Sequence, residues 1–290
     1  MTPIQQMLLG AGESKQIVTD NLEVFFDFGN TSCYNNTENH TSYNTNIINP
    51  NNLANSSHSN WKFGLGGTYG INYNGTNQSS YYLTTQTGNG GYINFHNSMS
   101  SASSVTNDFP ILYQRSGPFV GLGYGNYTLE FWYDYYRVSG RDQYIYLMRD
   151  SSDYSAKFQI IFNQGVLKAS LLDDQMSSSD NHLIIEESSS AHSYSNGYNG
   201  WDHLVISKIS NTVRIYHNNV NTTTRNGYSN KNYVADWNFS SDFNDCSLFD
   251  VNATYRYTGK FAIYRIYKNK GLTAAEVDQN FEAERGRFGV

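Results

Sequence analysis

The sequence contains little of several features that usually define a protein class. Only 15% of its 290 residues are charged, and the net charge is −6. An average soluble domain has about 25% charged residues. No run of Lys and Arg occurs, so a nucleic-acid backbone is not an expected partner. No stretch approaches the ~18 uninterrupted apolar residues of a membrane span, and no basic segment followed by an apolar run marks a secretory signal. The sequence therefore predicts no membrane insertion.

Cysteine and paired metal ligands are also scarce. The chain has two cysteines, Cys33 and Cys246, and a bridge between them would close a very long loop. Two thiols in a chain of this size are more often unpaired, but the sequence leaves the pairing open. No C-x-x-C, H-x-H or H-E-x-x-H spacing occurs among the cysteines and seven histidines, which argues against a dedicated zinc site.

Aromatic residues are abundant, and most of the apolar signal has the period of a strand. Aromatics make up 16% of the chain, with 25 tyrosines. In YTLEFWYDYY (127–136), Leu129, Phe131 and Tyr133 alternate with Trp132 and Asp134, which predicts two different faces. Further strands are expected at 22–29, 81–85, 91–95, 143–149, 157–163, 166–172, 201–208, 212–219, 220–224 and 259–268. Residues 30–80 and 173–200 look like polar surface loops, with Trp61 and Phe63 as anchors into the core.

The C-terminal end carries the only long helical pattern. Thr273 is the expected N-cap, Glu276 completes a capping box, and Leu272 with Val277 occupies the hydrophobic-staple positions. Gly286 is the expected stop. Many short strands with polar loops and one terminal helix predict an all-β fold, an antiparallel β-sandwich.

The chain begins with a short apolar segment, MTPIQQMLLG. Thr2 and Pro3 suit the start of a helix, on which the apolar residues share one face. Two turns are too few to persist alone in water, so this segment must dock either on its own domain or on another protein. The expected docking residues are Ile4, Met7, Leu8 and Leu9. We therefore divide the chain into a docking segment with a polar connector, 1–20, and a sandwich domain, 21–290.

Several segments resemble laminin-G-like and concanavalin A-like domains. LEVFFDFGNTSCY resembles their first strand, and NYTLEFWYDYY resembles a later one. WDHLVISKISNTVRIYHNNV resembles their Trp-x-His hairpin, although Asn218-Asn219 replaces the usual Asp-Gly turn. GKFAIYRIYKNKGLTAAEVDQN resembles their ending, whereas the familiar F-D-G-x-x-D-Y segment is missing. The resemblance implies a concanavalin A-like jelly roll, a fold that serves many functions.

The two ends of the chain carry a second resemblance. MTPIQQMLLGAG resembles the start of virion structural proteins of marine tailed phages, such as cyanophages, and AEVDQNFEAERGRFG resembles an ending common among their sandwiches. This resemblance implies a virion protein, assembled in the host cytoplasm, with capsid, neck or tail proteins as partners of its docking segment. A symmetric homo-oligomer, in our estimate a trimer, is typical of such appendages.

Related sandwiches include β-glucan hydrolases, so catalytic carboxylates must be considered. Glu130 and Asp134 share a strand face, but Trp132 occupies the position of the middle Asp in the E-x-D-x-x-E motif of those enzymes. Glu186 and Glu187 point to opposite sides of any strand. No G-x-S-x-G elbow occurs either. We expect no catalytic residues and a protein that is not an enzyme.

Carbohydrate binding is the alternative chemistry, because sugars stack on exposed aromatic rings. The candidate rim residues are Tyr135, Tyr136, Arg141, Tyr144, Tyr146, Tyr194 and Tyr198. Each tyrosine could instead pack on a sheet face, and His203 is expected to be structural. No cofactor is expected, although Asp150, Asp153, Asp173 and Asp174 could supply oxygens to a structural Ca²⁺ ion.

Three functions remain open at this point. The first is a virion appendage or decoration protein that contacts host-surface glycans. The second is a purely structural capsid or tail component without glycan binding. The third is a bacterial glycan-binding or glycan-active protein, which the missing signal peptide disfavours.

Overall fold

The structure is a computed structural model that describes fifteen parts of the chain. In several strands only the backbone is described. The described residues are 15–33, 52–54, 61–66, 91–94, 109–114, 125–137, 143–149, 156–163, 166–172, 182–187, 197–210, 212–226, 245–248, 257 and 259–290.

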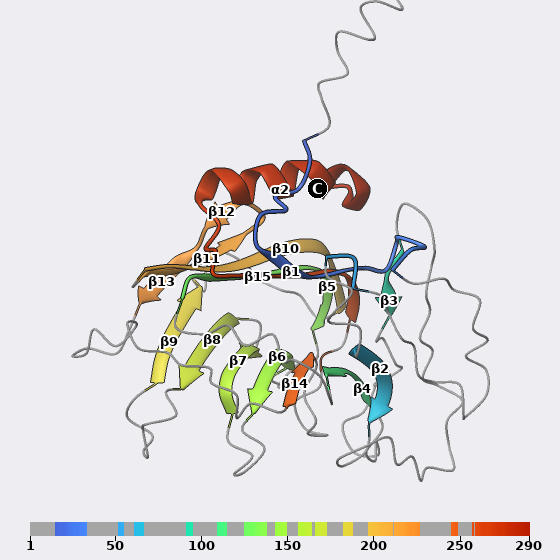
Figure 1. Ribbon diagram of the computed structural model, residues 1–290. Coiled ribbons are helices and arrows are strands. Elements are labelled where there is room, and N and C mark those ends of the chain that lie inside the picture. Colours follow the sequence, from blue (N-terminus) through green and yellow to red (C-terminus); the bar gives the residue numbers. More distant parts are fainter. Residues whose placement is uncertain are drawn as a thin grey trace, which may run out of the picture.

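The fold consists of two antiparallel β-sheets facing each other, with one helix on the outer face of the first sheet (Figure 1). Sheet A has the order β1-β15-β5-β10-β11-β12, with β3 paired to β15; sheet B has the order β13-β9-β8-β7-β6-β14-β4-β2. Helix α2, Ala274–Phe288, covers sheet A. The prediction of an antiparallel β-sandwich with a C-terminal helix is confirmed. The expected N-terminal helix lies outside the described residues.

The strand bounds are as follows. Sheet A contains β1 Leu22–Asp27, β3 Ile93–Asn94, β5 Tyr127–Arg137, β10 Gly197–Ile209, β11 Thr212–His217, β12 Val220–Asn221 and β15 Gly259–Lys268. Sheet B contains β2 Trp61–Gly66, β4 Phe109–Gln114, β6 Gln143–Arg149, β7 Ala156–Asn163, β8 Val166–Leu172, β9 His182–Glu187, β13 Thr223–Asn226 and β14 Asp245–Leu248. Among the described helices, none is long and apolar enough to cross a membrane.

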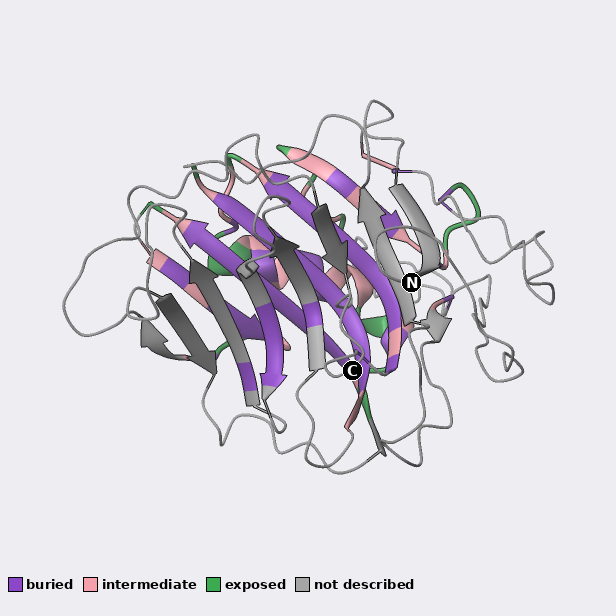
Figure 2. Ribbon diagram, turned by 90° about the horizontal axis from the view of Figure 1, so that it is seen from below, coloured by how far each residue is buried: buried purple, intermediate pink, exposed green. Residues whose placement is uncertain are grey.

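Strand β5 lies in the centre of sheet A, and its two faces have different roles. Its odd-numbered residues point between the sheets, where the rings of Tyr133 and Tyr135 lie 5.6 and 4.2 Å from that of Phe162 in β7. Its even-numbered residues point toward α2, where the ring of Trp132 stacks on Phe281. The alternation expected from the sequence is therefore confirmed. Figure 2, seen from the side of sheet B, shows that most strand residues with a described burial are buried.

A β-bulge in β15 keeps its large side chains on the correct faces. The register with β5 shifts between Phe261 and Ile263, so that Ala262 has no cross-strand partner of its own. Phe261 and Tyr264 both contact Phe131 between the sheets. Ala262 and Ile263 lie on the opposite face, in the cluster with Trp132. An extra residue of this kind lets consecutive side chains share one face.

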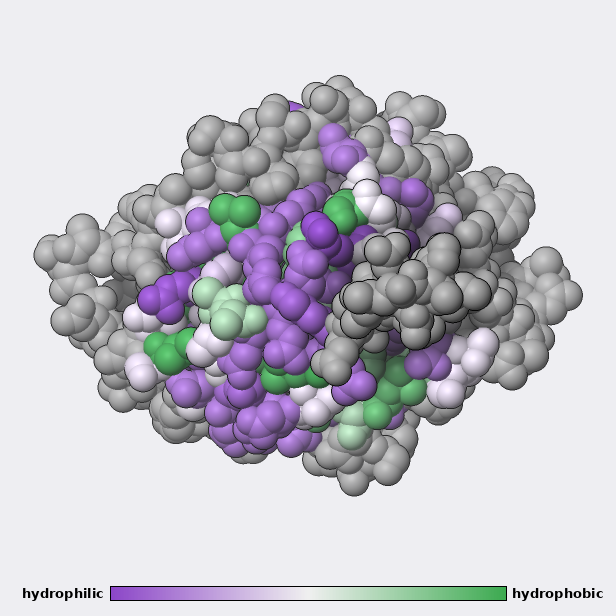
Figure 3. Space-filling model, turned by 90° about the horizontal axis from the view of Figure 1, so that it is seen from above, coloured by the Kyte–Doolittle hydropathy of each residue, from purple (hydrophilic) through white to green (hydrophobic). Residues whose placement is uncertain are grey.

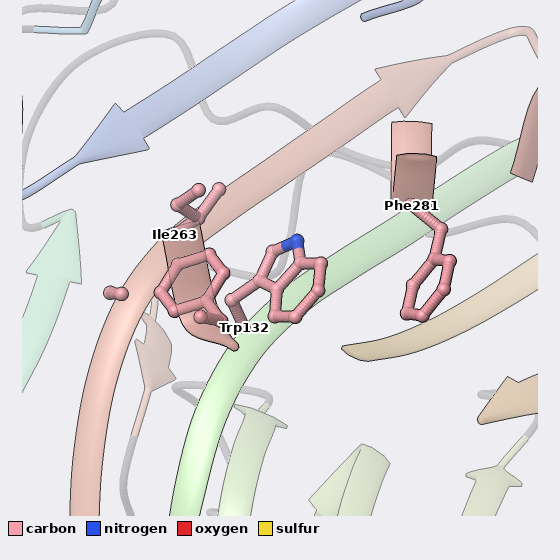
Figure 4. Packing of buried hydrophobic residues seen from close by; sticks show 5 residues of the cluster. Trp132, Ile263 and Phe281 are labelled. Carbon is pink, nitrogen blue, oxygen red and sulfur yellow. The ribbon is translucent and has the colours of Figure 1, made fainter. Parts of the chain in front are cut away.

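Helix α2 is held on sheet A by two apolar clusters. One contains Trp132, Ala262, Ile263, Phe281 and Phe288 (Figure 4). The other lies toward the start of the helix and contains Val205, Tyr216, Tyr267, Leu272 and Val277. Because sheet A is covered on both faces, the two-sheet sandwich becomes a three-layer structure along β5, β10 and β15.

The predicted start of α2 is confirmed, whereas its predicted end is not. The capping box of Thr273 and Glu276 is present, and Leu272 and Val277 share a cluster, as expected. The predicted stop at Gly286 is wrong, because the helix continues to Phe288 and ends at Gly289, whose φ is +74°. Phe288 stacks on Trp132 with ring centroids 4.3 Å apart, and this contact offsets the cost of an exposed helical glycine.

Four strands were missed in the sequence, all of them in sheet B. β2 and β9 fall within the segments expected to be polar loops, and β4 and β14 were not predicted. Pro110 in β4 and the polar composition of β14 obscure the alternating pattern that identifies a strand. The strand expected at 81–85 lies outside the described residues.

Cys33 is a free thiol in the core, next to the end of β1. Its side chain is fully buried, and its backbone N–H donates to the carbonyl of Asn30. A bridge from Cys33 to Cys246 is therefore absent. Burial raises the pKa of the Cys33 thiol to about 12, so the reactive thiolate is scarce at neutral pH.

Two glycines near α2 predict opposite effects of the same substitution. A Cβ on Gly271 would lie 2.2 Å from the carbonyl oxygen of Lys208, whereas a Cβ on Gly286 meets nothing within 4 Å. We expect Gly286→Ala to raise the free energy of unfolding by about 0.5–1 kcal/mol, and Gly271→Ala to lower it by about 2 kcal/mol or more. Urea denaturation measures both. Equal effects would contradict the close approach at Gly271.

A second prediction concerns the reactivity of Cys33. In a Cys246→Ser background, Cys33 is the single thiol. We expect it to resist Ellman's reagent at pH 8 in the folded protein and to react fully in denaturant, because burial keeps it protonated and inaccessible. Rapid labelling of the folded protein would show that the thiol is not in the core.

Candidate functional site

A cluster of buried polar side chains lies between the two apolar clusters, under α2. The carboxylate of Glu130 accepts hydrogen bonds from Arg265 Nη1, His203 Nε2 and Asn280 Nδ2, each at 2.8 Å. Arg265 also pairs with Glu284 on the helix. Glu130, His203, Arg265 and Asn280 have no exposed surface. We call these four residues together with Glu284 the Glu130 cluster.

The charges of this cluster stabilise one another. Burial alone would raise the pKa of Glu130, but the Arg265 guanidinium and the bonds from His203 and Asn280 outweigh it and lower the pKa to about 2. The pKa of Glu284 is raised, because burial outweighs the attraction of Arg265. Burial would lower the pKa of Arg265, but Glu284 and Glu130 raise it. Glu130 and Arg265 are therefore an ion pair at neutral pH.

The Glu130 cluster also fixes the connector that precedes β1. The backbone N–H of Val18 donates to Asn280 Oδ1 at 2.7 Å, and its carbonyl accepts from the Tyr267 hydroxyl at 2.9 Å. Outside these buried contacts, Lys15 pairs with Asp278 of α2 at 2.8 Å. The first described residues therefore lie along α2, on the side away from sheet B (Figure 1). That side is mainly hydrophilic, with small separate apolar spots (Figure 3).

The position of Glu130 bears on the hydrolase motif considered above. Glu130 and Asp134 lie on the same face of β5, as their spacing predicts. However, α2 seals Glu130, and Asp134 is 2% exposed and bound to Lys260 Nζ at 2.7 Å and to the Gly200 N–H at 3.1 Å. Neither carboxylate can reach a glycosidic bond in this conformation. His203 lies in the same sealed cluster, stacked on Trp132 at 4.7 Å.

Beyond the last turn of α2, the same face of sheet A reaches solvent. Trp201 and Tyr92 are partly exposed, and their rings form an edge-to-face pair with centroids 5.6 Å apart. The ammonium of Lys260 lies 5.8 and 5.5 Å from these two rings, and its side chain is 22% exposed. Trp201 is supported from below the surface by Phe288, at 4.8 Å. We call Tyr92, Trp201, Lys260 and Asp134 the aromatic shelf.

A second polar group lies at the hairpin of β10 and β11. The turn residues Asn218 and Asn219 both have positive φ values, 47° and 66°. Asn218 accepts from the His203 N–H and donates to Asp202 Oδ1, which lies 3.3 Å from His217 Nε2. The side chain of Asn218 thus closes the turn that Asp-Gly usually forms, whereas that of Asn219 donates to Asp278 of α2 at 2.7 Å. These residues support the hairpin.

The structure separates two neighbouring tyrosines that the sequence placed in one binding rim. Tyr135 has no exposed surface and packs on Phe162 between the sheets, so it belongs to the core and cannot contact a glycan. Tyr136 lies on the opposite face and is partly exposed. Its cross-strand partner is Tyr198, so the backbone brings these two candidates together at one end of sheet A.

The remaining candidates are only partly described. Tyr144 and Tyr146 lie on β6, with their side chains outside the described part of the structure. Among the described residues no group of three or more His, Cys, Asp or Glu side chains could hold a metal ion. The residues that lie entirely outside the description are Ile4, Met7, Leu8, Leu9, Arg141, Tyr194 and the Ca²⁺ candidates Asp150, Asp153, Asp173 and Asp174.

The aromatic shelf was missed in the sequence. Trp201 stood out only as part of the Trp-x-His hairpin, and Lys260 only as the start of a strand. Tyr92 lies about 110 residues before Trp201 in the sequence. It directly precedes β3, which pairs with β15, and β10 belongs to the same sheet, so the two residues come together in the fold. The alternation of β5 was the available signal, since it placed Asp134 on the same face as Trp132 and opposite to Tyr133.

Comparison with known proteins gives a limited likeness. No family model and no curated protein matches the sequence. Among solved structures, the binding domain of botulinum neurotoxin DC in complex with SialylT matches with a TM-score of 0.44 and 14% identity, over 62% of this chain and 41% of that one. The Ruminococcus gnavus IT-sialidase CBM40 matches with a TM-score of 0.41 and 8% identity, over 54% and 82%.

These matches are weak in both sequence and structure. A further match is a structure of botulinum neurotoxin type C, whose cell entry depends on interaction with two ganglioside molecules. Its TM-score is 0.43 and its sequence identity is 13%. This chain spans about two fifths of the neurotoxin chains it matches, 41% in both cases. Such likenesses assign no function to this chain.

The Glu130 cluster predicts a specific dependence of stability on pH. We expect Glu130→Gln to lower the free energy of unfolding at pH 7 by about 3–5 kcal/mol, since it leaves the Arg265 charge without this buried partner. The ordinary pKa of 4.5 falls to about 2 on folding, so the stability from Glu130 is complete above pH 4.5 and lost toward pH 2.

The difference in the free energy of unfolding between wild type and Glu130→Gln should therefore decrease below pH 4.5, by up to about 1.4 kcal/mol per pH unit. Urea denaturation between pH 3 and pH 7 measures this difference. Glu282→Gln is the matched control, because Glu282 lies on the same helix and pairs only with Arg285 at the surface. Its effect should stay below about 0.5 kcal/mol. A pH-independent gap for Glu130→Gln would contradict the ion pair.

Proposed function

We propose that this chain is a non-catalytic virion protein of a tailed phage. Residues 1–12 dock on another virion protein of the capsid, neck or tail, and the sandwich contacts glycans of the host surface. The protein assembles in the host cytoplasm as a symmetric oligomer, for which a trimer is expected. The resemblance of MTPIQQMLLGAG to phage virion proteins supports the docking role.

One structural observation carries the proposal. The connector is bound to α2 through Val18, Lys15 and Gln16, so the chain approaches the sandwich from the α2 side. Sheet B lies on the other side of sheet A (Figure 1). In a particle bound through the N-terminal residues, the connector would therefore join the sandwich at α2. A connector bound by buried side chains fixes this point of attachment better than a free linker would.

Docking can be tested with a deletion that keeps the connector and its contacts from Lys15 onward. Deletion of residues 1–12 should leave the melting temperature unchanged and abolish incorporation into phage particles, measured by mass spectrometry of purified virions. Ile4→Ser/Met7→Ser/Leu8→Ser should act in the same way, and Gln5→Ala/Gln6→Ala is the control that should still incorporate. Particles that contain the deleted protein would refute the docking role.

Glycan contact needs a separate measurement. The protein without residues 1–12 should bind host cells, and enzymatic removal of surface glycans should abolish this binding. A protein that enters particles but binds no host envelope material would instead be a structural decoration protein.

A further inference from the structure

We propose that the aromatic shelf of Tyr92, Trp201, Lys260 and Asp134 is a binding site for a neutral sugar ring. This inference rests on the proposed glycan contact and names the residues and the class of sugar for it. None of these four residues is among the rim positions expected from the sequence.

The two aromatic side chains of the shelf have polar groups that no described residue uses. The rings of Trp201 and Tyr92 contact each other and Lys260, and the ring of Trp201 also contacts Phe288. The indole N–H of Trp201 and the hydroxyl of Tyr92 make no hydrogen bond to described residues, and neither belongs to the buried polar atoms without a partner. Both residues are partly exposed to solvent. Rings with polar tips at the surface are typical of ligand sites, where they stack and orient a partner.

Three residues of the shelf, Asp134, Lys260 and Trp201, are held by contacts within the protein. Asp134 is 2% exposed, and its carboxylate is bound by Lys260 Nζ and by the N–H of Gly200. Phe288, which is itself buried, supports the ring of Trp201. Little side-chain entropy is lost when a ligand binds groups that are already held in place.

The charges around the shelf favour a neutral sugar over an acidic one. Lys260 is paired with Asp134 at 2.7 Å, and the nearby Arg287 is paired with Asp27 at 2.7 Å. Arg287 also donates to the carbonyl of Gly91, next to Tyr92. Among the described residues, each of these two cations thus has its own carboxylate. A carboxylate-bearing sugar would have to compete with Asp134 or Asp27, whereas the C–H face of a neutral ring can stack on Trp201 or Tyr92.

Titration of the full chain with neutral sugars tests the site. The probes are the methyl glycosides of glucose, galactose and mannose, with their neutral trisaccharides, followed by saturation-transfer NMR and calorimetry. We expect Trp201→Phe to weaken binding of the best probe about tenfold and Tyr92→Phe about threefold. Val220→Ser is the control, since Val220 is 61% exposed on β12, which β11 separates from β10. Circular-dichroism melts verify that each variant folds.

Three results would refute the proposal that the aromatic shelf binds a neutral sugar. These are the absence of binding to every neutral probe, preferential binding of N-acetylneuraminate, and unchanged affinity in both aromatic variants. If host-cell binding persists in Trp201→Phe/Tyr92→Phe, the shelf is wrong while the proposed function stands. If wild type binds no host glycan but binds the neutral probes at the shelf, the proposed function fails and the site remains.

Discussion

The rest of the described structure depends on the burial of the Glu130 carboxylate under a helix. A buried charge is costly unless donors surround it, and here they come from three separate elements, β10, β15 and α2. In the observed position of the helix, Asn280 donates a hydrogen bond to the Glu130 carboxylate and Glu284 pairs with Arg265. Apolar contacts on either side hold α2 against the sheet, and the polar cluster determines where along the sheet it lies.

Asn280 extends this constraint to the start of the chain. Its amide nitrogen donates to Glu130 and to the Tyr267 hydroxyl, while its oxygen accepts from Val18. The Tyr267 hydroxyl in turn donates to the carbonyl of Val18. The backbone of the connector is thus bound by two side chains that the buried cluster already orients. A pull on the N-terminal residues would act on the helix and the central sheet rather than on a surface loop.

Local signals in the sequence were sufficient for some elements and not for others. The period of β5 and the capping box of Thr273 involve residues within a few positions of one another, and both were predicted correctly. The cover of Glu130 depends on Asn280, 150 residues away, which no spacing pattern records. In the same way, alternation separates Tyr135 from Tyr136, but the side that faces water follows only from the placement of sheet B and α2.

The last turn of α2 decides which part of sheet A is core and which part is available to a ligand. Along the outer face of β5, Glu130 and Trp132 are fully buried, Asp134 is 2% exposed, and Tyr136 is partly exposed. Had the helix stopped at Gly286, Phe288 would not cover Trp132 or support Trp201. The extension to Phe288 therefore completes the core and also forms the rigid base of the aromatic shelf. A binding surface at the edge of a helix-covered sheet follows from the length of that helix.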